Sequence, residues 1–167
     1  MTELIIRPLE SSEWEMFRDF RLSALRAAPG VFSGRYEDSL ARRPEKWQAM
    51  IGGDDHQVFG LFDGRVLVGI TAVFQSDGDA TGASAMLAMS FILPAYRGRQ
   101  LSRLFYETRL AWVRARPRFR RVLVSARASN AASRRAIERY GFIETGRVPR
   151  VWPDSTTEDE ILFELQI

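Results

Sequence analysis

The chain has 167 residues, 46% of them hydrophobic, which is typical of one globular domain, and we expect that domain to span residues 1–167. It has no cysteine and one histidine, His56, so disulfides, thiolate or histidine metal sites, a Cys nucleophile and a Ser-His-Asp triad are not expected. The formal net charge is only +3, and Lys46 is the only lysine among the 24 cationic residues, so the others are arginines. A run of arginines is more often a solvated surface than a binding site.

Hydropathy gives no sign of a membrane or secreted protein. No stretch approaches the roughly 20 apolar residues that span a bilayer. The first residues, "MTELIIRPLE", lack a basic region followed by an apolar core. We therefore expect a cytoplasmic protein.

The first half of the chain predicts one strand, two helices and three more strands. Residues 3–9 form the first strand, and a helix runs from Ser12, which has capping-box spacing to Glu15, to the "APG" stop at 28–30. A second helix covers 44–51. Two β-branched runs within 57–74 flank Asp63-Gly64 and predict a hairpin. Residues 85–93 then predict a strand buried on both faces.

The second half alternates strands and helices. After a turn at 97–99, apolar residues at helical spacing predict a helix over 100–115. A strand at 121–126, a helix at 130–140 ended by Gly141, and strands at 142–148 and 158–166 follow. The sequence therefore predicts an α/β domain with a mixed central sheet flanked by helices.

The start of the helix near residue 100 is a candidate anion site. The first turn of a helix presents unpaired N–H groups and a positive dipole end, which suit a phosphate. Arg97 and Arg99 flank this turn. The local pattern thus favours a phosphate-bearing ligand.

Two segments resemble the Gcn5-related N-acetyltransferase (GNAT) family. "ILPAYRGRQLSR" is similar to its pyrophosphate-binding motif, and "NAASRRAIERYGFIETG" to its following Asn-helix-Gly-Phe segment. "RLSALRAAPGVFSGRYED" is similar to the acceptor-side region of some members. The resemblance implies the acyl-CoA N-acyltransferase fold, acetyl-CoA as acyl donor, and transfer of the acetyl group to a primary amine of a small molecule or protein by direct attack.

The same resemblance assigns cofactor-binding residues. Ser90, Phe91 and Ile92 would offer backbone groups to the pantetheine arm, one N–H polarising the thioester carbonyl. Asn130 would bond the pantetheine, act as the helix N-cap, or do both. The pyrophosphate cradle would comprise Gly98, Arg99, Gln100, Leu101, Ser102 and Arg103.

Four positions depart from the family pattern. Gln100 and Ser102 stand where the cradle usually has Gly and Gly or Ala, and helical backbone angles would tolerate them. The frequent thiolate-protonating tyrosine falls on Ile137, while Tyr140 is interpreted as a core aromatic. Ser125 replaces the glutamate that some members use as a base.

The catalytic groups therefore stay open. Glu37 and Ser90 are the candidates, the alternatives being a surface carboxylate for Glu37 and a buried, hydrogen-bonded hydroxyl for Ser90. Ordered water is a further route for the amine proton.

Two other functions and one assembly are considered. A non-catalytic acyl-CoA sensor fits the missing tyrosine, and a nucleic-acid-binding domain would use "RARPRFRR" at 114–121, a stretch without a recognition helix or aromatic platform. An exposed last strand would allow a homodimer. The sequence does not identify the amine acceptor.

Overall fold

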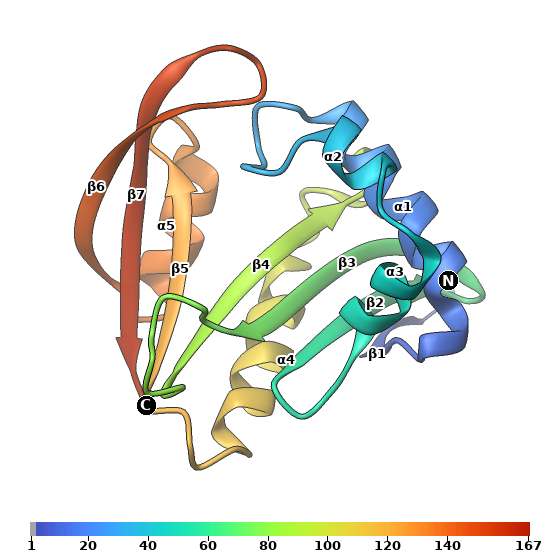
Figure 1. Cartoon of the computed structure of the whole chain (residues 1–167), viewed down its shortest axis with the longest axis horizontal. Helices are drawn as coiled ribbons and strands as arrows, with labels where there is room; N and C mark the ends of the chain where they lie inside the picture. Colours follow the sequence, from blue (N-terminus) through green and yellow to red (C-terminus); the bar gives the residue numbers. More distant parts are fainter. Residues whose placement is uncertain (1–2) are drawn as a thin grey trace.

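The structure, a computed structural model, describes residues 3–167 as one sheet with helices on both faces (Figure 1). The strands are β1 (Leu4–Pro8), β2 (His56–Asp63), β3 (Val66–Gln75), β4 (Ser84–Ile92), β5 (Arg121–Arg127), β6 (Ile143–Val151) and β7 (Thr157–Gln166). The helices are α1 (Trp14–Ala27), α2 (Tyr36–Leu40), α3 (Pro44–Ile51), α4 (Ser102–Arg114) and α5 (Ala131–Arg139). Short 3-10 turns precede α1 and α4.

The sheet has seven strands in the order β1-β2-β3-β4-β5-β7-β6. Neighbouring strands are antiparallel, except that β4 and β5 run parallel. A parallel pair requires a crossover, which α4 provides. The expected α/β fold with a mixed central sheet is confirmed.

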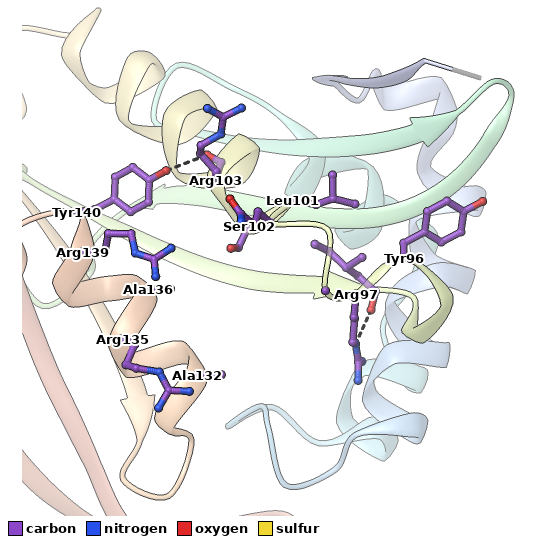
Figure 2. A pocket seen from close by; sticks show the side chains of 13 residues that line it. Tyr96, Arg97, Leu101, Ser102, Arg103, Ala132, Arg135, Ala136, Arg139 and Tyr140 are labelled. Atoms are coloured by element: carbon purple, nitrogen blue, oxygen red, sulfur yellow. Dashed lines mark hydrogen bonds between the residues drawn. The ribbon is translucent and has the colours of Figure 1, made fainter. Parts of the chain in front are cut away.

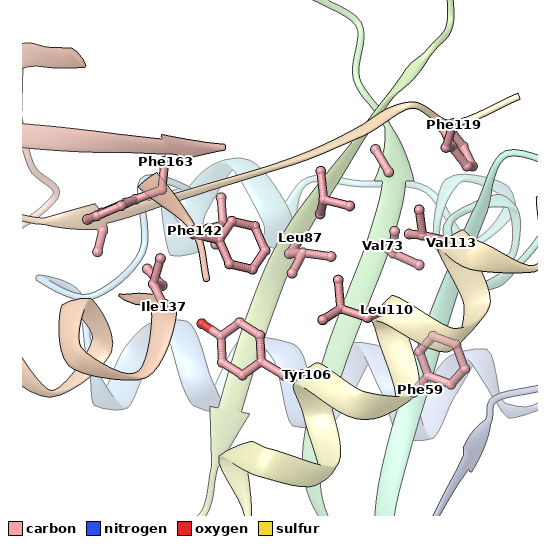
Figure 3. Close-up of a cluster of buried hydrophobic side chains, with 14 of the residues drawn as sticks. Phe59, Val73, Leu87, Tyr106, Leu110, Val113, Phe119, Ile137, Phe142 and Phe163 are labelled. Carbon is pink, nitrogen blue, oxygen red and sulfur yellow. The ribbon is translucent and has the colours of Figure 1, made fainter. Parts of the chain in front are cut away.

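Two apolar clusters hold the helices to the sheet. On one face, α1 and α3 bury Phe17, Leu25 and Trp47 against β2 and β3. On the other face, α4 and α5 pack against β3, β4, β5 and β7, with Leu110 and Ile137 inside the cluster (Figure 3). Burying side chains of this size contributes about 1.5–3 kcal/mol each, so the two clusters fix the position of both helix layers.

Strands β4 and β5 separate soon after they begin. Their paired residues are Ser84–Arg121, Ala85–Val122 and Met86–Leu123, and beyond these the strands diverge (Figure 1). Met89 lies in the left-handed region with φ 58°, beside a register shift of β4 against β3. The divergence leaves one edge of β4 unpaired from Leu87 onward. Side chains in the second half of β4 are also less buried, so the expectation of a strand buried on both faces holds only for its first half.

Several element boundaries differ from the sequence prediction. Helix α2 was not predicted, because five residues are too few to display a helical period. Before α1, it is the Glu13 carboxylate that accepts a hydrogen bond, from the Glu10 N–H at 2.9 Å, and not the predicted Ser12–Glu15 pair. The last strand, β7, lies between β5 and β6, so the prediction that it forms an exposed edge is wrong.

Candidate functional site

The turn before α4 presents a cluster of unpaired backbone donors. Among the hydrogen bonds of the described residues, none uses the N–H of Gly98, Arg99, Gln100, Leu101 or Ser102. The next two N–H groups, of Arg103 and Leu104, bond to carbonyls within this turn at 3.1 and 3.0 Å. The free donors lie at the positive end of the α4 dipole, an arrangement that binds phosphate oxygens.

This turn opens into a cavity of about 400 Å³ that we call the entrance cavity. Its walls are the end of β4, the first turn of α4 and one face of α5 (Figure 2). Four arginines contribute to its lining, namely Arg97, Arg103, Arg135 and Arg139. The cavity therefore combines fixed backbone donors with side-chain cations, a combination suited to a ligand with several phosphates.

Two residues of the turn adopt left-handed backbone angles. Gly98 has φ 78°, and a Cβ added there would meet no atom within 4 Å. Gln100 has φ 56°, so our expectation of helical angles at this position is wrong. A non-glycine residue in this region carries strain of order 1–2 kcal/mol, which Gln100 retains because the flanking strand and helix determine its path.

A second cavity, the gap cavity, lies where β4 and β5 diverge. Its strand walls are Leu87–Ser90 and Val124–Arg127, and α4, Asn130 and Ser133 complete it. The Asn130 side chain accepts the Ser133 N–H at 3.2 Å, so its N-cap role is confirmed while the residue also lines the cavity. The unpaired edge of β4 thus faces a cavity that begins beyond the entrance cavity along the same strand.

A buried arginine anchors the strand at the gap. Arg109, from α4, is 2% exposed and donates to Ser90 Oγ at 3.0 Å and to the Phe105 carbonyl at 3.1 Å. Ser90 Oγ also lies 2.7 Å from Thr71 Oγ1 on β3. Burial lowers the pKa of Arg109 to about 10, which leaves it charged at neutral pH. The Ser90 hydroxyl is thereby hydrogen-bonded on both sides.

Two tyrosines, Tyr106 and Tyr140, pack in the same apolar cluster as Ile137, the position of the tyrosine in the family pattern. Ile137 is fully buried in the apolar cluster, and the hydroxyl end of Tyr106 points toward it (Figure 3). Tyr106 lines the gap cavity, and burial raises the pKa of its phenol. Tyr140 stacks on Tyr106 at 4.6 Å but lines the entrance cavity, so the core interpretation of Tyr140 is only partly correct.

A third cavity, the α1 cavity, continues from the gap cavity on the side of α1. It has a volume of about 310 Å³ and shares the β4 and β5 residues of the gap. Glu160 of β7 lines it and is 8% exposed. The Glu160 carboxylate accepts a hydrogen bond from Ser125 Oγ at 2.6 Å and one from Arg150 Nε at 2.7 Å. A carboxylate therefore reaches the place next to Ser125 from the neighbouring strand.

Arg127 ties the walls of the α1 cavity together. Its Nη1 donates to the Gly30 carbonyl and to Asp154 at 2.8 Å, and its Nε donates to Glu158 at 2.6 Å. The guanidinium thus joins the loop after α1 to the β6–β7 connection across the end of the gap (Figure 1). This loop carries Val31 and Phe32, which line both the gap cavity and the α1 cavity.

The predicted site residues are distributed unevenly over these cavities. Gly98, Gln100, Leu101, Ser102 and Arg103 line the entrance cavity together with Ile92, while Arg99 lies outside its lining and stacks on Tyr96 at 5.2 Å. Ser90 lines the gap cavity, and Phe91 is buried against α1. Glu37 is exposed on α2 and lines none of the three cavities.

Sequence reasoning missed the residues that only the packing brings to the cavities. These are Arg21, Tyr106, Arg109, Glu160, Arg135 and Arg139. The last two share the entrance-facing side of α5 with Ala132 and Ala136, a four-residue helical spacing that would have revealed them. For the other four, the sequence offers no local signal.

The arginines of segment 114–121 are largely engaged within the protein. Arg116 and Arg118 donate to the Asp54 carbonyl, at 3.4 and 2.6 Å, and Arg116 stacks on Trp112 at 3.6 Å. Arg121 pairs with Asp79 and Glu164 at 3.7 Å. These contacts favour a structural role for the segment.

The described residues contain neither a metal-binding cluster nor a membrane-spanning helix. Within residues 3–167, no three His, Asp or Glu side chains lie close enough together to hold a metal ion. Within the same range, no helix is long and apolar enough to cross a membrane.

Solved structures with the same fold are numerous. An acetyltransferase of the GNAT family from Streptococcus pneumoniae has a TM-score of 0.85 and 19% identity, over 99% of this chain and 100% of that chain. Spermidine N-acetyltransferase from Vibrio cholerae, in complex with CoA and spermine, has a TM-score of 0.76 and 17% identity, over 98% and 95%. NAA60 from Arabidopsis thaliana, in complex with acetyl-CoA, has a TM-score of 0.75 and 15% identity, over 99% of both chains.

The sequence of this chain matches a family but no individual curated protein. The family described as "Acetyltransferase (GNAT) family" matches residues 12–142, a range that contains the turn before α4, the gap between β4 and β5, and α5. On this match over most of its length, the chain belongs to the GNAT acetyltransferase family.

Proposed function

We propose that this protein is an enzyme that transfers the acetyl group of acetyl-CoA to a primary amine of a small molecule, in the cytoplasm. One observation carries the proposal. The gap between β4 and β5 leads from a turn with free N–H groups to a small cavity that contains a buried carboxylate. Acetyl transfer needs these parts in this order, because the thioester must meet the amine at the far end of the pantetheine.

The donor half of the site would bind CoA mainly through backbone groups. The free N–H groups of 98–102 take the pyrophosphate, and Arg135 and Arg139 lie across the entrance cavity for the remaining phosphate charge. The unpaired edge of β4 bonds the pantetheine amides in the manner of an added strand. An N–H on this edge, next to Met89, polarises the thioester carbonyl.

Glu160 is the proposed base. The attacking amine must lose a proton as its nitrogen bonds to the thioester carbon, and a carboxylate lining the acceptor cavity can accept it. Ser125 Oγ, which donates to Glu160 at 2.6 Å, holds the carboxylate toward the gap. Glu37 is proposed only for the rim of the acceptor side, because it is exposed on α2.

Tyr106 is the proposed partner of the departing sulfur. Breaking the C–S bond leaves a thiolate, which the Tyr106 hydroxyl can stabilise by donating a hydrogen bond. The raised pKa of this phenol keeps it protonated at neutral pH. Proton transfer from water then completes the reaction, since a free thiol has a pKa of about 8.5.

The first test measures thiol release from acetyl-CoA with a panel of primary amines, together with the thermal shift caused by CoA, acetyl-CoA and oligonucleotides. An acetyltransferase gives amine-dependent thiol release and stabilisation by both CoA forms. Stabilisation without thiol release for any amine would instead identify the acyl-CoA sensor. Stabilisation by oligonucleotides alone would contradict both.

The second test addresses direct attack. Without cysteine, and with no histidine beside Ser90 or Ser125, no side chain here is an activated nucleophile of the usual kind. Mass spectrometry of the protein quenched with acetyl-CoA should therefore find no acetyl adduct on either serine. An adduct on Ser125, whose hydroxyl already donates to Glu160, would replace direct attack by an acyl-enzyme route.

A further inference from the structure

The α1 cavity contains a buried cation for which the described residues provide no counterion. Arg21 of α1 is 7% exposed and lines the cavity. Among the described residues, its Nε and Nη1 atoms are buried and have no hydrogen-bond partner. Most buried side-chain donors are hydrogen-bonded, so these two atoms require an explanation.

Among residues 3–167, no carboxylate forms an ion pair or hydrogen bond with Arg21. Its guanidinium lies over the Phe32 ring at 4.5 Å, and the charge that acts on it is another cation, Arg42. The other charged groups of the cavity already have partners: Arg127 pairs with Asp154 and Glu158, and Glu160 pairs with Arg150. The unsatisfied charge is therefore specific to Arg21.

Keeping this guanidinium buried is unfavourable for the free protein. Burial lowers the pKa of Arg21 to about 10, so the group is still charged at neutral pH. A ring face compensates only part of the lost hydration of a cation. An anion entering the cavity would supply the missing acceptors, in a setting where charge-assisted hydrogen bonds are strong.

We propose that Arg21 binds a carboxylate on the acceptor, so that the amine substrate is a small amino acid. The inference rests on the proposed function, since it specifies the substrate of the same site. The cavity contains one unpaired cation, Arg21, to receive the carboxylate, and one carboxylate, Glu160, to receive the amine. Its volume of about 310 Å³ is at the lower end for ligand pockets, which suits a single amino acid.

The charges of the cavity distinguish this class from others. A polyamine would bring further positive charge toward Arg21, and a phosphate dianion would meet the Glu160 carboxylate. A carboxylate carries a single charge and matches the planar fork of one guanidinium. The pair of charges therefore selects an amine that also bears a carboxylate.

The test measures binding without depending on catalysis. Calorimetry on the protein saturated with CoA compares N-acetyl derivatives of the protein amino acids, β-alanine and γ-aminobutyrate with their own carboxamides. At least one acid should bind about tenfold or more tightly than its amide, because the amide leaves the buried guanidinium unpaired. In Arg21→Met the preference should fall below about threefold, and in Arg21→Lys, which keeps the charge but loses the fork, it should be intermediate.

Arg26→Met is the matched control, since Arg26 is exposed on the same helix, and it should keep the preference of the unaltered protein. Equal binding of acids and amides, no binding of any acid, or a preference that survives Arg21→Met would overturn the inference. Should Arg21→Met fail to fold, the unaltered protein and Arg21→Lys still decide.

Thiol release with the free amino acids and their amides separates this inference from the proposed function. Equal transfer to acids and amides would keep the acetyltransferase and remove the carboxylate site. Selective binding of acids without any thiol release would keep the carboxylate site and remove the acetyltransferase.

Discussion

The two ends of the gap between β4 and β5 are built in different ways. The entrance cavity relies on one continuous turn, in which the N–H groups of residues 98–102 have no partner among the described residues, and on the face of α5 that lines the cavity. The α1 cavity takes its charged groups from α1, β5 and β7, which lie far apart in the chain. The donor end thus depends on local backbone geometry, whereas the acceptor end depends on tertiary packing.

The two ends also differ in the free-energy cost of their polar groups. Backbone donors at a helix start remain hydrated in the free protein, so their presence costs little. Arg21, Arg109 and Glu160 are buried charges, which stabilise the fold only when they are paired. The acceptor end therefore carries the polar groups whose alteration should change chemistry and specificity, while alterations at the donor end should change CoA affinity.

Gly98→Val should weaken CoA binding at the donor end. Valine strongly resists the φ of 78°, and the new side chain would project into open space beside the entrance cavity and not into the core. We expect the affinity for CoA to fall by about a hundredfold, or about 2.7 kcal/mol, with the fold retained. Calorimetry measures the affinity, and Gly78→Val, in an exposed loop without a positive φ, is the control. Unchanged CoA affinity would refute the cradle.

Glu160→Gln should slow acetyl transfer at the acceptor end. The substitution keeps the side-chain size and removes the proton acceptor, so kcat/KM should fall by about a hundredfold at neutral pH. The deficit should shrink as pH rises, because a larger fraction of the amine is then already deprotonated. Initial rates across pH test this, with CoA affinity expected to stay unchanged.

Glu164→Gln, on the same strand but outside the α1 cavity, provides the control for Glu160 and should keep full activity. A loss in Glu160→Gln that is equal at every pH, or that follows a lowered melting temperature, would assign Glu160 a structural role with Arg150.

Tyr106→Phe tests the group nearest the missing family tyrosine. Removing the hydroxyl should lower kcat by about ten- to a hundredfold, because the thiolate loses a hydrogen-bond donor in a buried site. Tyr140→Phe is the matched control from the entrance cavity and should leave kcat within about tenfold. The reverse ranking, with folding and CoA affinity intact, would move the proton donor to Tyr140.

Gln100→Gly should strengthen CoA binding at the donor end, with the smallest effect of these substitutions. Glycine adopts the φ of 56° without strain and lets a phosphate approach more closely. We expect CoA affinity to rise by about two- to tenfold and the melting temperature to stay within a few degrees. Titration of CoA measures this, and a weaker affinity would show that the Gln100 side chain itself contacts the ligand.

Much of the fold was accessible from the sequence, because periodic apolar residues and turn residues act locally. The hairpin around Asp63-Gly64, the helix before Gly141 and the N-cap at Asn130 were predicted close to their observed limits. Short or irregular features escaped, among them α2, the left-handed backbone of Gln100 and the position of β7 inside the sheet. Helix α2 is too short to display a helical period, and the other two features depend on long-range packing.

A proline, an Arg-Gly-Arg turn and a following helix lie within a few residues of one another, so the sequence was sufficient to predict the free N–H groups before α4. The charged groups of the α1 cavity, in contrast, come together only in the folded chain. Ser125 takes the place of the glutamate in the family pattern, yet the pairing of β5 with β7 brings Glu160 to its hydroxyl. The sequence around Arg21 does not predict its burial, because Phe32 in the loop after α1 covers it only in the folded protein. Strand register and loop closure join residues that are distant in the chain, and no local pattern records such contacts.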